Sequence, residues 1–146
     1  SVLFHESAHT LHEERAYPPE FDKLSSLEYQ KQDAFSYWWR TGQSSNYAGF
    51  VSDYASTDAD EDFAELFAFY ILYSDTEWEE LMKKAEGKNR SEATLTGREI
   101  IEKKLAIMKE YLRSEYSADL DKIRAEAQKR LAKVASMDFS QYPKGY

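Results

Sequence analysis

Apolar side chains recur every three or four residues along most of this chain, which is the spacing of one face of an α-helix. The pattern predicts helices over residues 2–15, 33–40, 60–73, 76–86, 96–113 and 118–135. The polar stretches between them predict loops over 17–32, 41–46 and 88–93, and a short extended or turn segment over 49–55. We therefore expect a mainly α-helical fold with few and short strands.

The last two predicted helices follow each other closely, and each has one apolar stripe. We expect them to form a helical hairpin, about residues 96–135, whose stripes pack in the core. The alternative for these stripes is a helix face that binds a partner.

The predicted helix over 60–73 is almost wholly apolar or aromatic from Phe63 onward, which is typical of a buried helix. Glu65 lies within this run, and a lone buried carboxylate is costly unless it is paired or bound to a metal. Glu61 has a simpler alternative, because Asp58 and Glu61 have the spacing of a helix cap and its reciprocal acid.

With 146 residues, 42% of them hydrophobic, the chain is long enough for a single domain over 1–146 with one core. Its formal net charge of −8 argues against a nucleic-acid partner, because phosphates require a basic face, and against electrostatic adhesion to an anionic membrane. The lack of cysteine excludes disulfides and thiolate metal sites. No apolar run reaches the roughly 18 residues of a membrane span, and no signal peptide is visible.

The candidate chemistry begins at His5-Glu6-Ser7-Ala8-His9, which reads H-E-x-x-H. On a helix, residues four apart share a face, so the imidazoles of His5 and His9 can reach one tetrahedral Zn²⁺. Glu6 would flank such a metal and could take a proton from a water bound to it. The alternative is a polar helix face whose imidazoles are only solvated.

A catalytic zinc needs a third protein ligand and one open position. No glycine and further histidine follow at the spacing of the metzincins. Glu61 and Glu65 lie four apart on the second helix of interest, so one can bind the metal while the other accepts the free N–H of a ligating histidine. A calcium loop is excluded, because Phe63 and Phe69 occupy the positions of its glycine and its closing acid.

Three segments resemble one family in their order along the chain: 5–12, 49–56 and 61–65. Together they look like the zinc-binding metallopeptidases of Bacteroidetes, which are known as substrate-import-associated zinc metallohydrolase lipoproteins. The pattern is similar, more distantly, to the catalytic domain of anthrax lethal factor, and both belong to the gluzincins. The resemblance covers most of the chain, because residues 97–124 also look like the C-terminal helices of the family.

The resemblance implies a zincin-like core in which His5, His9 and Glu61 bind zinc and Glu6 acts as the general base. It also implies that Glu65 is the partner of a ligating histidine.

Tyr54 lies seven residues before Glu61, which matches the spacing of the lethal-factor tyrosine that faces the metal. A phenol there can donate a hydrogen bond to the oxyanion that forms on a substrate carbonyl. The alternative is an aromatic side chain that only packs in a strand or turn.

Zincin helices normally follow a sheet whose edge strand lines the substrate cleft, yet this chain begins four residues before His5. We therefore expect that an N-terminal part with this sheet, and any targeting segment, is missing from the chain. The resemblance implies a location in the cell envelope, in the periplasm or on the outer membrane through a lipid anchor outside this chain, and association with a nutrient-uptake complex.

Two functions are open at this point. The first is a zinc-dependent hydrolase, a peptidase acting on a peptide or protein substrate. The second is a non-catalytic accessory or binding lipoprotein of a nutrient-uptake system, whose zinc site is structural or vestigial. A water in an open fourth coordination position favours the first, and a closed position favours the second.

Overall fold

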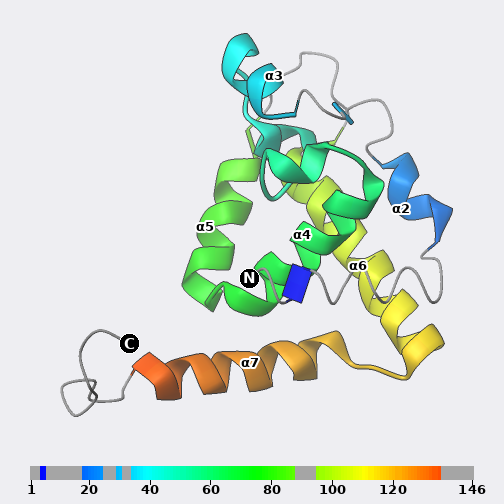
Figure 1. Ribbon diagram of the computed structural model, residues 1–146, viewed down its shortest axis with the longest axis vertical. Helices are drawn as coiled ribbons and strands as arrows, with labels where there is room; N and C mark the ends of the chain where they lie inside the picture. Colours follow the sequence, from blue (N-terminus) through cyan, green and yellow to red (C-terminus); the bar gives the residue numbers. More distant parts are fainter. Residues whose placement is uncertain (1–3, 6–17, 25–28, 31–33, 88–94, 136–146) are drawn as a thin grey trace, which may run out of the picture.

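The computed structural model describes residues 4–5, 18–24, 29–30, 34–87 and 95–135, and the regular elements in these ranges are all helical (Figure 1). The α-helices are α2 (Pro19–Lys23), α3 (Ala34–Thr41), α4 (Ala59–Leu72), α5 (Asp75–Ala85), α6 (Gly97–Tyr116) and α7 (Leu120–Ala135). Two 3₁₀ turns, η2 (Ser45–Ala48) and η3 (Tyr54–Ser56), connect α3 to α4. The prediction of a mainly α-helical fold is confirmed. Within the described ranges, no helix is both long enough and apolar enough to cross a bilayer.

Two predictions for the N-terminal part of the chain have different outcomes. The predicted helix over 2–15 lies outside the described residues except for Phe4 and His5, which are helical. The predicted loop over 17–32 is wrong in part, because it contains α2. The reason is Pro19 at the first helical position, where a missing N–H costs nothing and the fixed φ of proline suits a helix start.

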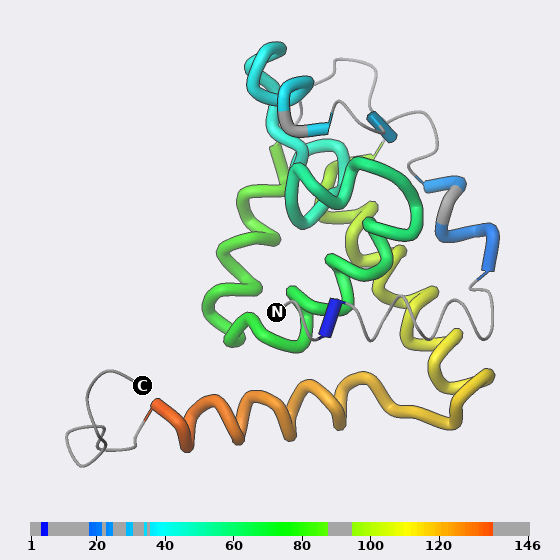
Figure 2. The backbone as a smooth tube through the Cα atoms, in the orientation of Figure 1, coloured from blue at the N-terminus to red at the C-terminus, as the bar shows by residue number. Residues whose placement is uncertain are grey.

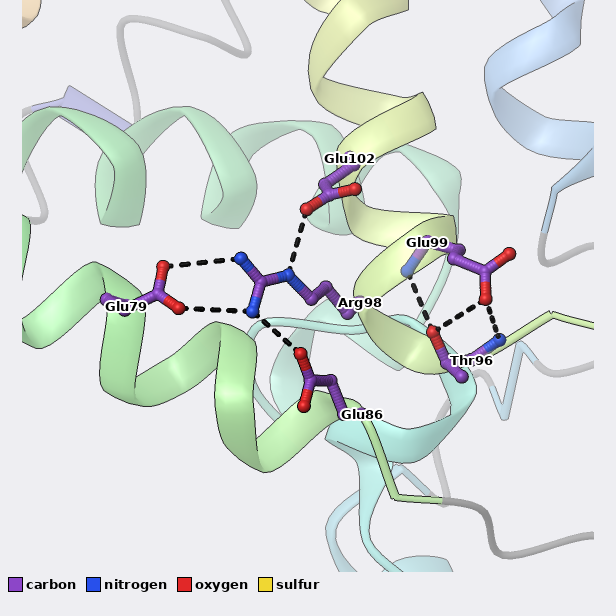
Figure 3. Close-up of polar contacts among 6 residues, drawn as sticks. All are labelled: Glu79, Glu86, Thr96, Arg98, Glu99 and Glu102. Atoms are coloured by element: carbon purple, nitrogen blue, oxygen red, sulfur yellow. Dashed lines mark hydrogen bonds and ion pairs between the residues drawn. The ribbon is translucent and has the colours of Figure 1, made fainter.

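Three helices begin at caps that the local sequence encodes. The Asp58 side chain accepts the N–H of Glu61 at the start of α4. Ser74 and Thr96 start α5 and α6, and each forms a capping box with the glutamate three residues on. Figure 3 shows the second box, in which Thr96 and Glu99 bond to each other reciprocally. Each such cap stabilises its helix by about 1 kcal/mol.

The core gathers around α4, on which η3 and α7 both pack. Its aromatic members meet edge to face: the Phe63 ring lies 5.4 Å from that of Phe21 on α2 and 5.6 Å from that of Tyr111 on α6. The largest fully buried apolar side chains come from most of the elements: Phe21, Phe50, Phe63, Leu66, Ile71, Met82, Ile101, Met108, Tyr111, Leu112 and Leu120.

Two glycines bring the start of α6 close to the η2 turn. A Cβ on Gly97 would lie 1.9 Å from the carbonyl oxygen of Asn46, so a larger residue would push α6 away. Gly49 has a φ of +91° and lies against Ile100, where a Cβ would come within 2.3 Å of its side chain. The left-handed conformation and the lack of space both require glycine at position 49.

A buried ion pair crosses the core between α6 and α4. Lys104 Nζ lies 2.7 Å from Asp62 Oδ2, and each side chain is only 1% exposed. The ammonium also donates to the Gly49 carbonyl oxygen over 2.8 Å and stands 4.2 Å above the Phe50 ring centroid. The hydroxyl of Tyr29 donates to the same Asp62 oxygen over 2.8 Å.

An exposed ion-pair network joins α5 to α6. The Arg98 guanidinium contacts three carboxylates: it binds Glu79 with two nitrogens, at 3.1 and 3.3 Å, and reaches Glu86 at 2.8 Å and Glu102 at 3.0 Å (Figure 3).

The last two helices follow each other as expected, but α7 does not fold back antiparallel to α6 (Figure 1). Figures 1 and 2 show α7 running across one end of the fold rather than back along α6. The side chain of Arg124 fixes α7 to the end of α4 by donating to the carbonyl oxygens of Tyr70 and Tyr73, and Gln128 donates to that of Ile71. The stripe of α6 packs in the core as predicted, but the second half of the α7 stripe does not, since Leu131 and Val134 are 42% and 50% exposed.

Candidate functional site

The first turns of α4 carry two glutamates on one face. The Asp58 cap occupies the backbone N–H of Glu61, at 2.9 Å, and leaves the Glu61 side chain available for other contacts. Glu65 follows one turn later and so lies on the same side of the helix. Both side chains are largely buried, with 18% and 16% of their surface exposed.

The imidazole of His5 lies between these two carboxylates. Its Nε2 is 2.8 Å from Glu61 Oε2, and its Nδ1 is 3.0 Å from Glu65 Oε2. The His5 side chain is itself 12% exposed. Two residues that are far apart in the sequence from His5 therefore hold both of its ring nitrogens.

Ser52 adds a further contact to this group. Its Oγ donates to Glu65 Oε1 over 3.1 Å and accepts the N–H of Ala55, also over 3.1 Å. Ser52 therefore links Glu65 to the loop that leads into η3.

Tyr54 stands beside His5, with 5.9 Å between the ring centroids and 42° between the ring planes. Partial burial raises the pKa of the Tyr54 phenol, and the carboxylates of Glu61 and Glu65 raise it further. The phenol is therefore protonated at neutral pH and remains a hydrogen-bond donor. About a third of its surface, 36%, faces solvent, so a ligand can reach it.

The loop that carries Tyr54 is anchored at its far end by α3. Trp38 Nε1 donates to Ser56 Oγ over 2.7 Å, and that hydroxyl donates to the Asp53 carbonyl oxygen, also over 2.7 Å. The Asp53 carboxylate accepts in turn from the hydroxyl of Ser45. These contacts fix the loop independently of Glu65.

The donor set fits a zinc ion. An imidazole nitrogen and a carboxylate oxygen are ordinary zinc ligands, and tetrahedral bonds of about 2.0–2.2 Å place two ligand atoms about 3.3 Å apart. When Nδ1 carries the ring hydrogen and donates it to Glu65, the Nε2 lone pair of His5 faces the buried Oε2 of Glu61. Two such acceptors at 2.8 Å need a proton or a cation between them, and a separation of about 0.5 Å more would accommodate zinc.

The structure brings together four of the six residues that the sequence singled out: His5, Tyr54, Glu61 and Glu65. Glu6 and His9 lie outside the described residues. Among the residues that the structure describes, there is no group of three or more His, Cys, Asp or Glu side chains that could hold a metal. The metal role of His5 and Glu61 thus stays a prediction.

Sequence reasoning missed two features near the site. Ser52 lies within the segment 49–56 that resembles the family, but only Tyr54 was singled out there. Asp62 is more buried than Glu65, and its partner Lys104 lies in the core-facing stripe of α6, between Ile101 and Leu105. A lysine in phase with a core stripe was the available signal, because it needs a buried partner.

Comparisons with known proteins agree on one relationship. The sequence profile of a family described as "Putative zinc-binding metallo-peptidase" matches residues 1–121. The crystal structure of a protein of that description from Bacteroides caccae is similar to this chain, with a TM-score of 0.77 and 31% sequence identity. The similarity covers 94% of this chain and 48% of the Bacteroides caccae chain, so this chain spans about half of that length. A search of curated proteins found no match.

Proposed function

The chain belongs to the family of zinc-binding metallo-peptidases, and from that premise we propose that it is a zinc-dependent peptidase with His5, His9 and Glu61 as metal ligands. The observation that carries this proposal is the contact of both ring nitrogens of His5 with two glutamates of α4, at 2.8 and 3.0 Å. Two largely buried carboxylates are costly unless they are paired or bound to a metal, and both of these face the same imidazole.

The bound zinc would polarise the scissile carbonyl and make water a stronger nucleophile at neutral pH. Glu6 takes the proton of the attacking water and passes it to the leaving amine. Glu65 accepts the Nδ1–H of His5, which fixes the ring so that Nε2 faces the metal.

Tyr54 donates its phenolic hydrogen to the oxyanion that develops on the substrate carbonyl. Two features support this role: its ring lies beside that of His5, 5.9 Å away, and 36% of its surface is exposed to solvent. One such donor typically contributes about 10²–10³ in rate.

Elemental analysis of the purified protein tests the metal part of the proposal. We expect about one zinc per chain in the wild type and a loss of zinc in His9→Ala. Full zinc occupancy of His9→Ala at low free zinc would show that the ligand set is wrong.

Hydrolysis of a quenched-fluorescence peptide mixture tests the catalytic part. Glu6→Gln should keep its zinc and lose about 10²–10⁴ in rate, since it removes only the general base. Glu80→Gln, an exposed acid on α5, is the matched control and should behave as the wild type. Wild-type turnover by Glu6→Gln would end the catalytic proposal and leave the accessory-protein hypothesis in place.

A further inference from the structure

We propose that Ser52 is a positioning residue whose single hydroxyl orients both the Glu65–His5 pair and the turn that carries Tyr54. This inference rests on the proposed function, in which His5 binds zinc through Nε2. It concerns a residue outside the predicted ligands, base and oxyanion donor.

The two contacts of Ser52 determine how its hydroxyl is used. A serine hydroxyl has one hydrogen to donate and lone pairs to accept. Ala55 N–H donates to Ser52 Oγ, and an amide cannot accept there, so the hydroxyl hydrogen is free for the carboxylate of Glu65. The direction of the Ser52–Glu65 hydrogen bond is therefore fixed.

The hydrogen bond from Ser52 also affects the imidazole of His5, because Glu65 contacts both residues. With Oε1 accepting from Ser52, the carboxylate of Glu65 is held with its Oε2 3.0 Å from His5 Nδ1. When His5 binds zinc through Nε2, its ring hydrogen lies on Nδ1, where Glu65 is placed to accept it. The hydroxyl of Ser52 thus favours the tautomer of His5 that can bind zinc.

The same oxygen holds the turn on which Tyr54 sits. Ala55 follows Tyr54 directly, and its N–H bonds to Ser52 Oγ across the start of η3. The Tyr54 ring in turn lies 5.9 Å from the His5 ring. One hydroxyl therefore contacts both the turn that carries the proposed oxyanion donor and the glutamate beside a proposed zinc ligand.

Ser56 provides a matched control within the same loop. Its hydroxyl is fully buried and bridges Trp38 Nε1 and the Asp53 carbonyl oxygen. It anchors the loop without contacting Glu65. A loss of loop stability should appear in Ser56→Ala, whereas a loss of Glu65 orientation should appear only at Ser52.

The experiment compares Ser52→Ala, Ser52→Thr and Ser56→Ala with the wild-type protein at one pH. Zinc affinity is measured by competition with a chromophoric chelator. We expect Ser52→Ala to bind zinc about 10-fold more weakly, at the lower end of the 10–100-fold effect of groups that orient a ligand. Ser52→Thr keeps the hydroxyl and should stay within about threefold of the wild type, as should Ser56→Ala.

A spectroscopic readout reports the tautomer itself. The chain has three histidines, so long-range ¹H–¹⁵N spectra of ¹⁵N-histidine-labelled protein can resolve His5. We expect a hydrogen-bonded Nδ1–H in the wild type and in Ser52→Thr, and faster exchange of that hydrogen with water in Ser52→Ala. Thermal unfolding of the metal-free variants checks that each one is folded.

Three results would overturn the inference: wild-type zinc affinity in Ser52→Ala, an equal loss in Ser52→Thr, or an equal loss in Ser56→Ala. If the wild-type protein itself binds no zinc, the proposed function fails, and the Nδ1–H signal of the metal-free protein still decides whether Ser52 orients His5. The two failures are therefore distinguishable.

Discussion

Replacing Lys104 by methionine tests the buried ion pair between α6 and α4. Methionine is close to lysine in length and has no charge, so the packing against Phe50 is largely kept. The change leaves the Asp62 carboxylate, 1% exposed, with the hydroxyl of Tyr29 at 2.8 Å. It also removes the donor that the Gly49 carbonyl oxygen has from the ammonium at 2.8 Å.

The expected loss follows from these two changes. Removing one partner of a buried pair costs about 3–5 kcal/mol, because an uncompensated charge remains in the interior. For a protein of this size, each 1 kcal/mol corresponds to a shift of about 2–4 °C in melting temperature, so we expect Lys104→Met to melt about 6–20 °C lower.

The double variant Asp62→Asn/Lys104→Met separates the charge from the other losses. Asparagine still accepts from Tyr29 but has no charge, so the largest part of the penalty disappears. The Gly49 carbonyl oxygen still lacks its donor, which costs about 1–3 kcal/mol. We therefore expect the double variant to be more stable than Lys104→Met, although it carries one more substitution.

Urea unfolding followed by circular dichroism gives the free energies of unfolding for the wild type, for Lys104→Met, for Asp62→Asn and for the double variant. The m-value should stay constant, which shows that the surface exposed on unfolding is the same. A loss below about 1 kcal/mol in Lys104→Met, or a double variant less stable than the single one, would contradict a charged pair at this position. Burial lowers the pKa of Lys104, and Asp62 opposes that shift. The measurement is therefore made near neutral pH and not in alkaline solution, where Lys104 would lose its charge.

Three further predictions concern the site and the surface. Glu61→Gln should weaken zinc binding strongly, and the affinity of the wild type should fall as the pH falls, because imidazole ligands must be unprotonated; chelator competition at several pH values checks both. Tyr54→Phe should keep its zinc and lose about 10²–10³ in peptide hydrolysis, and an unchanged rate would exclude Tyr54 as the oxyanion donor. Arg98→Ala should cost about 1 kcal/mol or less, because its three carboxylate partners are exposed, and added salt should reduce the difference in melting temperature.

The helices that could be predicted from the sequence are those whose limits depend on nearby residues. Ser74 and Thr96 accept the N–H groups of glutamates three residues on, so α5 and α6 start within one residue of the predicted positions. The start of α2 also depends on a nearby residue: Pro19 suits the first position of a helix, although the apolar pattern alone predicts a loop over 17–32.

The direction in which α7 runs across the fold could not be predicted from nearby residues. The apolar stripe of α7 predicts that one face is covered but not by which neighbour. The contacts that decide this are hydrogen bonds from Arg124 and Gln128 to carbonyl oxygens at the end of α4, about 50 residues away. Since these carbonyl groups belong to the backbone, no residue pattern identifies them, and the half-exposed Leu131 and Val134 follow from that docking.

Glu61 shares the capping spacing of Glu77 and Glu99, but its side chain makes a different contact. Three helices start with an acid three residues after the cap, and the sequence alone gives each the same interpretation. In α5 and α6 the glutamate returns to the backbone N–H of its own cap, at 3.0 and 3.5 Å. In α4 the backbone of Glu61 bonds to Asp58, but its carboxylate lies 2.8 Å from His5. The helix N-terminus favours a negative charge at this position in either case. The same capping spacing therefore places the carboxylate of Glu61 beside His5, at the proposed metal position, and only the direction of the side chain distinguishes the two roles.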